Sequence, residues 1–578
     1  MKRLALLPLA TGNIGTGNTF TLATFTTMKR LALLPLLALA AAPCLAQDPA
    51  TNAPAEPPTI TARLASVDAV EAAIQGVLAA VGRPGMPPEA SPRHWLAELC
   101  DVDPARPVLI RLWNGDDGDP EGVAAVPGAE PTAERLADAF DGVTPVRGAD
   151  GVWTKPDDDG TGQAVAFRDG YVLVAKPRRY LDEADALLAL APRFPGAAAE
   201  AEIRPRAIAD RNLRTGRELD PDGMMERMFK GFETVSFGLA FDKSAGLLVP
   251  FSMTPPASDP AAFKDFAAAP ALDPATALWS DGATASFAIS DFGRVFGGLL
   301  DFYADTFDRI LSDHGRHLRE AGIDEDTIKR QEKAVAELSE MFRRCKAFRA
   351  ASGFGSISAA GGFSAIGDYD LGDPATAAWM RDYQRRSFEN QAAAAATNCF
   401  SFRETSDGWE WGFDPVAAFA AGLDLPAFPI PSSELLRRCY GRDGIRGSAR
   451  LLPGTKASYR FALAPVGKEP PAPARDPIPA SALARFAPGA KALSCFRMRM
   501  SDIVREILLA SGAAPEGAVP PGGALRFDLA AKDGLPVGVL AVEPAEMKAL
   551  FVSFMFGVTR AMVPAAPAPS GEDALFDD

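Results

Sequence analysis

Apolar and polar residues alternate along several short stretches of the chain, and a helical pattern follows each of them. Phe287 and Ile289 alternate with small residues, and in 496–500 apolar residues alternate with arginines. Period two is typical of a strand with one buried face. An aspartate after such a strand can cap a helix, because its carboxylate accepts from exposed backbone N–H groups. The pattern therefore predicts strand-to-helix transitions at three aspartates, Asp210, Asp291 and Asp502.

A second pattern predicts β-hairpins that lead into helices. Asp-Gly pairs separate apolar runs, and such pairs tolerate the positive φ angles of tight hairpin turns. A proline then begins the helix, since its missing N–H would be unpaired in the first turn. The predicted turns are Asp169-Gly170, Asp407-Gly408 and Asp533-Gly534, and the predicted helix starts are Lys176-Pro177, Asp414-Pro415 and Glu543-Pro544.

Together the two patterns predict an α+β fold of repeated β-α-β-β-α modules, with mainly antiparallel sheets covered by helices. No run of βα units with buried Val/Ile strands indicates a parallel, doubly wound sheet. The modules fall at roughly 122–191, 202–266, 283–391 and 493–562, with extra strands near 399–463. The predicted divisions are a linker at 47–62, modules at 63–195, 196–272, 273–395 and 481–563, a strand-rich segment at 396–480 and an acidic tail at 564–578.

The third module contains a long charged segment, 324–350, with one apolar stripe. Val335, Leu338, Phe342 and Cys345 follow three-four-three spacing, so a helix places them on one face. We expect this helix to pack on the body of the protein. A coiled-coil contact with a partner is the alternative, although it needs more sustained heptads.

The N-terminal region has the pattern of a secretory signal. The nine residues from Met1 recur at Met28–Leu36, and the second copy leads into an apolar run that ends in small residues. This run is shorter than a membrane span needs. We expect Met28 to be the working start, residues 1–46 to form the signal region, and cleavage near Ala46 to release a periplasmic or extracellular protein without a transmembrane helix.

The charge of the chain argues against one class of partner, and its cysteines leave the disulfide pairing open. The chain has 578 residues, with 59 Lys and Arg against 74 Asp and Glu, for a net charge of −15. Cleavage would remove four basic residues and no acidic one, which changes the net charge to −19. Such a surface argues against nucleic acid as a partner. The spacing of Cys100, Cys345, Cys399, Cys439 and Cys495 fixes no disulfide pairing.

Acidic clusters and two histidines are the candidate metal ligands. Carboxylates in loops suit weak Ca²⁺ binding, and His314 and His317 would share one face of a helix. Polar hairpin loops and solvated histidines are the structural alternative, and we expect no cofactor beyond weak calcium. The candidates are Asp116, Asp117, Asp119, Asp157, Asp159, His314 and His317.

The sequence contains no nucleophile elbow, phosphate-binding loop or dinucleotide fingerprint. Paired carboxylates of a hydrolase are set by the fold, so the sequence does not test them. Trp409, Trp411 and Phe413 alternate and would project from one face of a strand. They are candidates for stacking on a glycan or on a partner's apolar side chains, and filling the core is the alternative.

Three stretches resemble large exported bacterial proteins of unknown function that are built from repeated α+β modules. They are DVDPARPVLIRLW at 101–113, FRDGYVLVAKPRRYLDEADALL at 167–188 and TASFAISDFGRVFGGLL at 284–300. The resemblance covers most of the mature chain. It implies export and fold, and it carries over no activity and no functional residues.

The leading functional expectation is a non-enzymatic binding or scaffold protein of the cell envelope, whose partner is a protein or a glycan. One alternative is an extracytoplasmic hydrolase that uses carboxylates, with or without a divalent cation. The other is a carrier of an apolar ligand, because the 35 phenylalanines can line a cavity as well as a core. The sequence does not indicate the oligomeric state.

Overall fold

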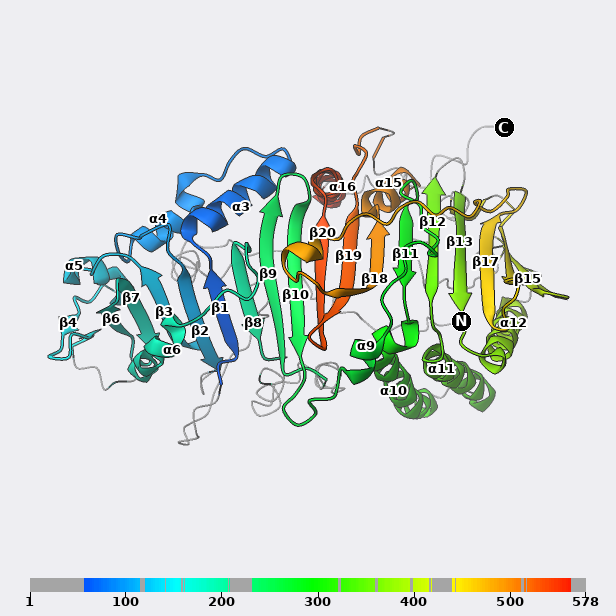
Figure 1. The fold of residues 1–578 in the computed structure, drawn as a ribbon, viewed down its shortest axis with the longest axis horizontal. Coiled ribbons are helices and arrows are strands. Elements are labelled where there is room, and N and C mark those ends of the chain that lie inside the picture. The colour runs from blue at the N-terminus through cyan, green and yellow to red at the C-terminus, as the bar shows by residue number, and fades with distance from the viewer. Residues whose placement is uncertain are drawn as a thin grey trace, which may run out of the picture.

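The computed structural model describes residues 57–562 except 115–119, 141, 157–159, 161, 206, 208–230, 321–323, 359–361, 396–398, 415–416, 418–438, 442, 511–513 and 516 (Figure 1). In this part of the chain, twenty strands form one continuous sheet, and each pairing between neighbours is antiparallel. The predicted α+β class with antiparallel pairing is confirmed.

The pairings give a single linear strand order from one edge of the sheet to the other. That order is β4 (Val146–Arg147), β5 (Trp153–Thr154), β6 (Ala164–Arg168), β7 (Tyr171–Lys176), β3 (Pro120–Pro127), β2 (Val108–Asn114), β1 (Ile60–Leu64), β8 (Ala199–Ile203), β9 (Thr234–Asp242), β10 (Gly246–Thr254), β20 (Leu535–Val542), β19 (Leu525–Lys532), β18 (Lys491–Met498), β11 (Ala285–Ile289), β12 (Ala351–Ser358), β13 (Gly362–Asp370), β17 (Ser458–Pro465), β16 (Ile445–Leu451), β15 (Gly408–Phe413) and β14 (Phe400–Thr405).

Helices lie along both ends of these strands. In Figure 1, α3, α15 and α16 lie at the upper ends of the strands, and α9 to α12 lie at their lower ends. The α-helices are α3 (Val67–Ala80), α4 (Pro92–Ala97), α5 (Ala133–Leu136), α6 (Ala184–Leu188), α9 (Lys264–Ala268), α10 (Phe292–Glu320), α11 (Glu325–Cys345), α12 (Pro374–Ala395), α15 (Met500–Ala510) and α16 (Pro544–Met562). Short 3-10 helices are η1 (Pro88–Ala90), η2 (Asp138–Phe140), η3 (Arg178–Glu183) and η4 (Ala482–Arg485).

The predicted strand-to-helix transition is confirmed at Asp291, which follows β11 and caps α10. Its Oδ1 accepts from the backbone N–H of Arg294 at 3.0 Å. The transition predicted at Asp502 is also present, since α15 follows β18, but Asp502 is not its cap because α15 already begins at Met500. Asp502 lies inside the first turn and forms an ion pair with Arg505 at 3.0 Å. The third predicted aspartate, Asp210, lies outside the described residues.

Two predicted hairpin turns have the expected backbone. Asp169 and Gly170 have φ angles of 55° and 73°, and Asp533 and Gly534 have 53° and 81°. The Asp407-Gly408 turn is displaced by one residue, since Gly408 is already the first residue of β15. Pro544 begins α16 and Pro177 precedes η3 as predicted, while residues 415–416 after Asp414 lie outside the described residues.

The predicted module boundaries in the N-terminal part of the chain differ from the structure. β1 begins at Ile60, within the segment expected to be a linker, because pairing with β2 and β8 orders it. The order strand, helix, hairpin therefore first occurs as β1, α3, β2 and β3. The described residues of 122–191, expected to form a module, instead contain most of β3, strands β4 to β7 and short helices.

Apolar clusters cover both faces of the sheet. Along β19, Ala530 packs into a cluster that contains Phe194, Phe486 and Val539. The flanking Leu529 belongs to a second cluster with residues of α9 and α10. Since successive strand residues point to opposite faces, the centre of the sheet is buried on both sides.

The charged helix predicted at 324–350 is α11, and its apolar stripe packs on the protein as expected. The Phe342 ring stacks on Tyr303 and Phe307 of α10, with centroid distances of 5.2 and 5.6 Å. Ser339 Oγ donates to the carbonyl oxygen of Ala304 at 3.1 Å. From the other side, Arg386 of α12 pairs with Glu337 at 3.3 Å.

Candidate functional site

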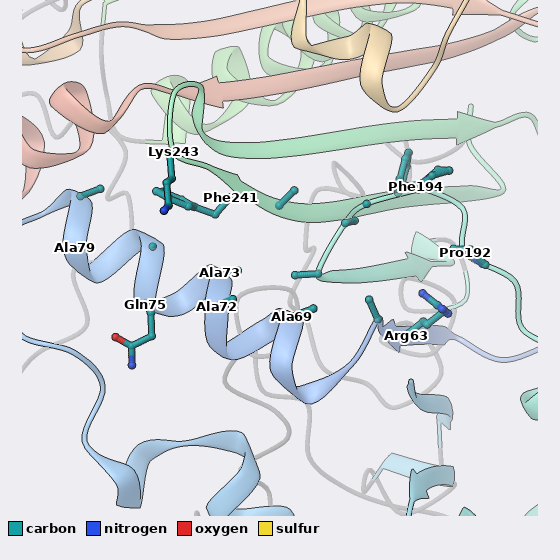
Figure 2. Close-up of a pocket in the computed structure, with 18 of the residues that line it drawn as sticks. Arg63, Ala69, Ala72, Ala73, Gln75, Ala79, Pro192, Phe194, Phe241 and Lys243 are labelled. Carbon is teal, nitrogen blue, oxygen red and sulfur yellow. The ribbon is translucent and has the colours of Figure 1, made fainter. Parts of the chain in front are cut away.

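A groove of about 970 Å³ lies between α3, the segment 192–198 and the end of β9 (Figure 2). Its described lining is almost entirely apolar, and Arg63, Gln75 and Lys243 are the side chains in it that carry nitrogen or oxygen. The lining residues are Arg63, Ala65, Ala69, Ala72, Ala73, Gln75, Gly76, Ala79, Ala80, Pro192, Phe194, Pro195, Gly196, Ala197, Ala198, Ala240, Phe241, Lys243 and Pro544.

One wall of the groove is the small-residue face of α3. Alanine favours the helix, and Ser66 caps it by accepting from the backbone N–H of Ala69 at 3.0 Å. Val67 and Val70 are buried in the core, whereas Ala72 and Ala79 are exposed. The small residues follow helical spacing and leave room beside the helix. They are Ala69, Ala72, Ala73, Gly76, Ala79 and Ala80.

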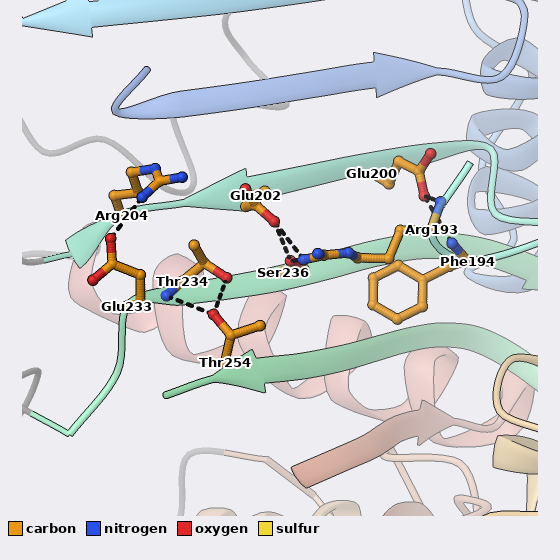
Figure 3. Close-up of polar contacts among 9 residues, drawn as sticks. All are labelled: Arg193, Phe194, Glu200, Glu202, Arg204, Glu233, Thr234, Ser236 and Thr254. Atoms are coloured by element: carbon orange, nitrogen blue, oxygen red, sulfur yellow. Dashed lines mark hydrogen bonds and ion pairs between the residues drawn. The ribbon is translucent and has the colours of Figure 1, made fainter. Parts of the chain in front are cut away.

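The opposite wall, 192–198, is held by two glutamates of β8 and a serine of β9 (Figure 3). Glu200 Oε2 accepts from the backbone N–H groups of Arg193 and Phe194, both at 2.9 Å. The Arg193 guanidinium bonds in turn to Glu202 and to the buried Ser236 hydroxyl. Hydrogen bonds to charged groups are stronger than neutral ones, so this network fixes the wall against the sheet.

Two cationic side chains lie toward opposite ends of the groove (Figure 2). The Arg63 side chain is 19% exposed, and its Nη1 lies 3.7 Å from Glu200 Oε1. Its Nε is buried without a hydrogen-bond partner in the described structure. Lys243 is exposed in the β9–β10 turn. The described lining contains no carboxylate, so the groove combines an apolar surface with two cationic groups, Lys243 and Arg63 with its neighbour Glu200.

The three aromatic residues predicted to form a binding surface differ in exposure. Trp409 is 1% exposed, and its indole N–H donates to Gln384 of α12 at 2.6 Å. Trp411 and Phe413 are half-buried, and Phe413 stacks on Phe400 at 4.6 Å. Only Trp411 and Phe413 therefore present surface to a partner.

The predicted metal ligands lie outside the part of the chain whose side chains the structure describes. His314 and His317 lie on α10, and their side chains are outside the described part. In the portion that is described, no three His, Cys, Asp or Glu side chains form a group able to hold a metal ion. The loop candidates Asp116, Asp117, Asp119, Asp157 and Asp159 lie outside the described residues.

The five cysteines whose pairing the sequence did not fix are free thiols in the structure. Four are buried and Cys345 is half-buried. Burial raises the pKa of Cys100 and Cys345 to about 11, and it also raises the pKa of Cys495. These thiols are therefore protonated near neutral pH and behave as small apolar core residues.

A buried acid with a raised pKa is the feature that would favour a hydrolase, and Glu546 has this property. Burial raises its pKa, and hydrogen bonds from Ser501 oppose the effect. Its two carboxylate oxygens accept from the Ser501 backbone N–H at 2.7 Å and from the Ser501 hydroxyl at 2.6 Å. Glu546 thus caps the start of α15, and it does not line the groove.

No known protein family, no curated protein and no solved structure matches this chain. None of the described helices is both long and apolar enough to cross a membrane. The fold and the site together define an α+β protein with a long antiparallel sheet and an apolar groove beside its interior strands β8 and β9. Sequence reasoning missed this groove, although the spacing of alanine and glycine over 69–80 was its signal.

Proposed function

We propose that the mature chain is an exported, non-enzymatic binding protein that holds an apolar ligand in the groove between α3 and β9. The observation that carries the proposal is the apolar lining of this groove. Its volume of about 970 Å³ is at the upper end of the range of small-molecule sites. A ligand that covers the exposed Ala72 and Ala79 faces gains free energy in proportion to the apolar area removed from water.

The chemistry of the lining supports binding over hydrolysis. The described lining residues include no Ser, Cys, His, Asp or Glu, which are the usual nucleophiles, bases and metal ligands. Burial raises the pKa of Glu546, but both of its carboxylate oxygens accept hydrogen bonds from Ser501 of α15. Stacking of a protein or glycan partner on Trp411 and Phe413 stays a prediction. Ligand binding in the groove does not depend on it.

Export supports the same assignment. The basic, apolar and small-residue regions that end at Ala46 are those of a secretory signal. N-terminal sequencing of the protein recovered outside the cytoplasm tests this step. We expect a start near Gln47, and recovery of the full chain from the cytoplasm would contradict export.

We also propose that the sheet is built from repeated modules of similar structure. The order strand, helix, hairpin occurs in three described segments, which begin at β1, β11 and β18. In each, the first strand pairs with the first strand of the hairpin. Superposition of these segments in an experimental structure tests the idea, since unrelated helix placements would contradict it.

Titration of the mature protein with the neutral fluorescent probe N-phenyl-1-naphthylamine tests binding in the groove. We expect saturable enhancement at one probe per chain. Ala72→Trp should abolish it, because the exposed Ala72 faces the groove and an indole there fills the space. Ala186→Trp, at an exposed position of α6 outside the groove, is the matched control and should leave the titration unchanged. Equal binding by both variants would refute the proposal.

A further inference from the structure

We infer that the ligand is a single-chain anionic amphiphile whose head group binds Arg63 while its apolar chain lies along α3. This inference rests on the proposed function and names its ligand class. A fatty acid and an alkyl phosphate share the chemistry that the site would recognise, an anion at one end of one apolar chain.

Arg63 has unused hydrogen-bonding capacity at the edge of an apolar groove. The distance of 3.7 Å from its Nη1 to Glu200 Oε1 exceeds that of a hydrogen bond, and its Nε is buried without a partner in the described structure. A guanidinium has five N–H donors in a planar fork. Leaving such donors unpaired in a buried place costs free energy, and an anionic head group would satisfy them.

Glu200 cannot turn fully toward Arg63 without releasing the opposite wall. Its Oε2 accepts both backbone N–H groups that hold this wall, from Arg193 and Phe194. Its Oε1 is buried and has no hydrogen-bond partner in the described structure. The Arg63–Glu200 pair therefore balances charge without a hydrogen bond at 3.7 Å, and the part of the Arg63 side chain that stays exposed can meet a ligand.

The groove beyond Arg63 suits an unbranched apolar chain. Phe194 lies nearer Arg63, and Phe241 lies nearer Lys243 (Figure 2). The lining face of α3 from Ala69 to Ala80 is roughly 16 Å long at the rise of an α-helix. Lys243 at the far end adds a second positive charge, which disfavours a cationic ligand.

An extended peptide fits this groove less well than an amphiphile. A peptide in extended form needs partners for its backbone N–H and C=O groups. The strands beside the groove offer no free edge, because β1, β8 and β9 each pair with a neighbour on both sides. The few polar side chains in the described lining cannot replace such an edge.

Displacement of N-phenyl-1-naphthylamine by matched C12 compounds tests the inference on the full mature chain. The compounds are dodecanoate, dodecyl phosphate, dodecan-1-ol and dodecyltrimethylammonium, each kept below its micelle-forming concentration. A charged hydrogen bond corresponds to about tenfold or more in affinity. We therefore expect both anions to displace the probe at about tenfold lower concentration than the alcohol, and the cation to be weakest.

Variants then assign the preference to Arg63. Arg63→Met should remove the advantage of the anions while leaving the alcohol unchanged, and Arg63→Lys should keep part of it. Arg168→Met, at an exposed arginine of β6, is the control. Equal displacement by the anions and the alcohol on the wild-type protein would overturn this inference and leave the proposed function standing. Failure of every compound, together with failure of the probe to bind, would refute the proposed function.

Discussion

Gly76 of α3 and Phe241 of β9 are in such close contact that no side chain fits between them. A Cβ atom built on Gly76 would lie 2.2 Å from Cδ1 of the Phe241 ring. The helix and the strand can approach only because this position is glycine. The contact fixes the depth of the groove at the end where Lys243 lies.

Gly76→Ala should therefore destabilise the protein although alanine favours a helix. Overpacking of this kind costs about 1–3 kcal/mol, which outweighs the gain of about 1 kcal/mol in helix propensity. Chemical denaturation measures the change. Gly298→Ala on α10 is the control, since its Cβ would meet nothing within 4 Å and the variant should be unchanged or more stable. Equal effects of the two substitutions would show that Phe241 does not limit the space.

Glu546 should contribute to stability by capping α15. Glu546→Leu leaves the Ser501 N–H and hydroxyl without a buried partner, and we expect a loss of about 1–3 kcal/mol for each group. Glu546→Gln keeps an acceptor for the N–H and an amide for the hydroxyl. In thermal unfolding the Gln variant should lie close to wild type, and a Leu variant as stable as wild type would contradict the capping role.

The thiols should react slowly while the protein is folded. Burial raises the pKa of Cys100 and Cys345 to about 11, so little thiolate is present near pH 8. With a thiol-specific chromogenic reagent, we expect the half-buried Cys345 to react first and the rest to react only after denaturation. Rapid modification of several thiols in the native protein would contradict their burial.

Asp242 should make stability depend on pH in the acid range. Hydrogen bonds from the Ser244 hydroxyl and from the backbone N–H groups of Ser244 and Ala245 lower its pKa from 3.8 to about 2. A lowered pKa in the folded state contributes stability above the unfolded pKa of 3.8, and this contribution is lost as the pH falls through about 2. Asp242→Asn removes the charge at every pH. The difference in thermal midpoint between wild type and this variant should therefore shrink as the pH falls from 5 to 2. A constant difference would contradict the assignment.

Local patterns in the sequence predicted the elements better than their assembly. The Asp169 and Asp533 turns and the Asp291 cap follow from backbone preferences of neighbouring residues, and the structure has them. By contrast, β1 begins at Ile60 because strands far along the chain pair with it. The continuity of the sheet likewise depends on non-local pairs such as β10 with β20, which no local pattern specifies.

The sequence predicted the candidate site only in part, because contacts between residues far apart in the chain form it. Trp409 and Trp411 are easily noticed in the sequence. Their exposure, however, depends on packing against neighbouring rings and α12. The groove is formed by alanines, which carry no chemistry of their own. Its cationic end depends on the distance between Arg63 and Glu200, which are adjacent only through pairing of β1 with β8.

A crystal structure of the mature protein with 12-bromododecanoate tests the central claim most directly, because the anomalous signal of bromine locates the end of the chain. We predict the carboxylate within hydrogen-bond distance of Arg63 and the bromine in the groove beside α3, toward the end where Phe241 lies. Bromine at another place on the protein, or a groove that stays empty at saturating ligand, would contradict the account.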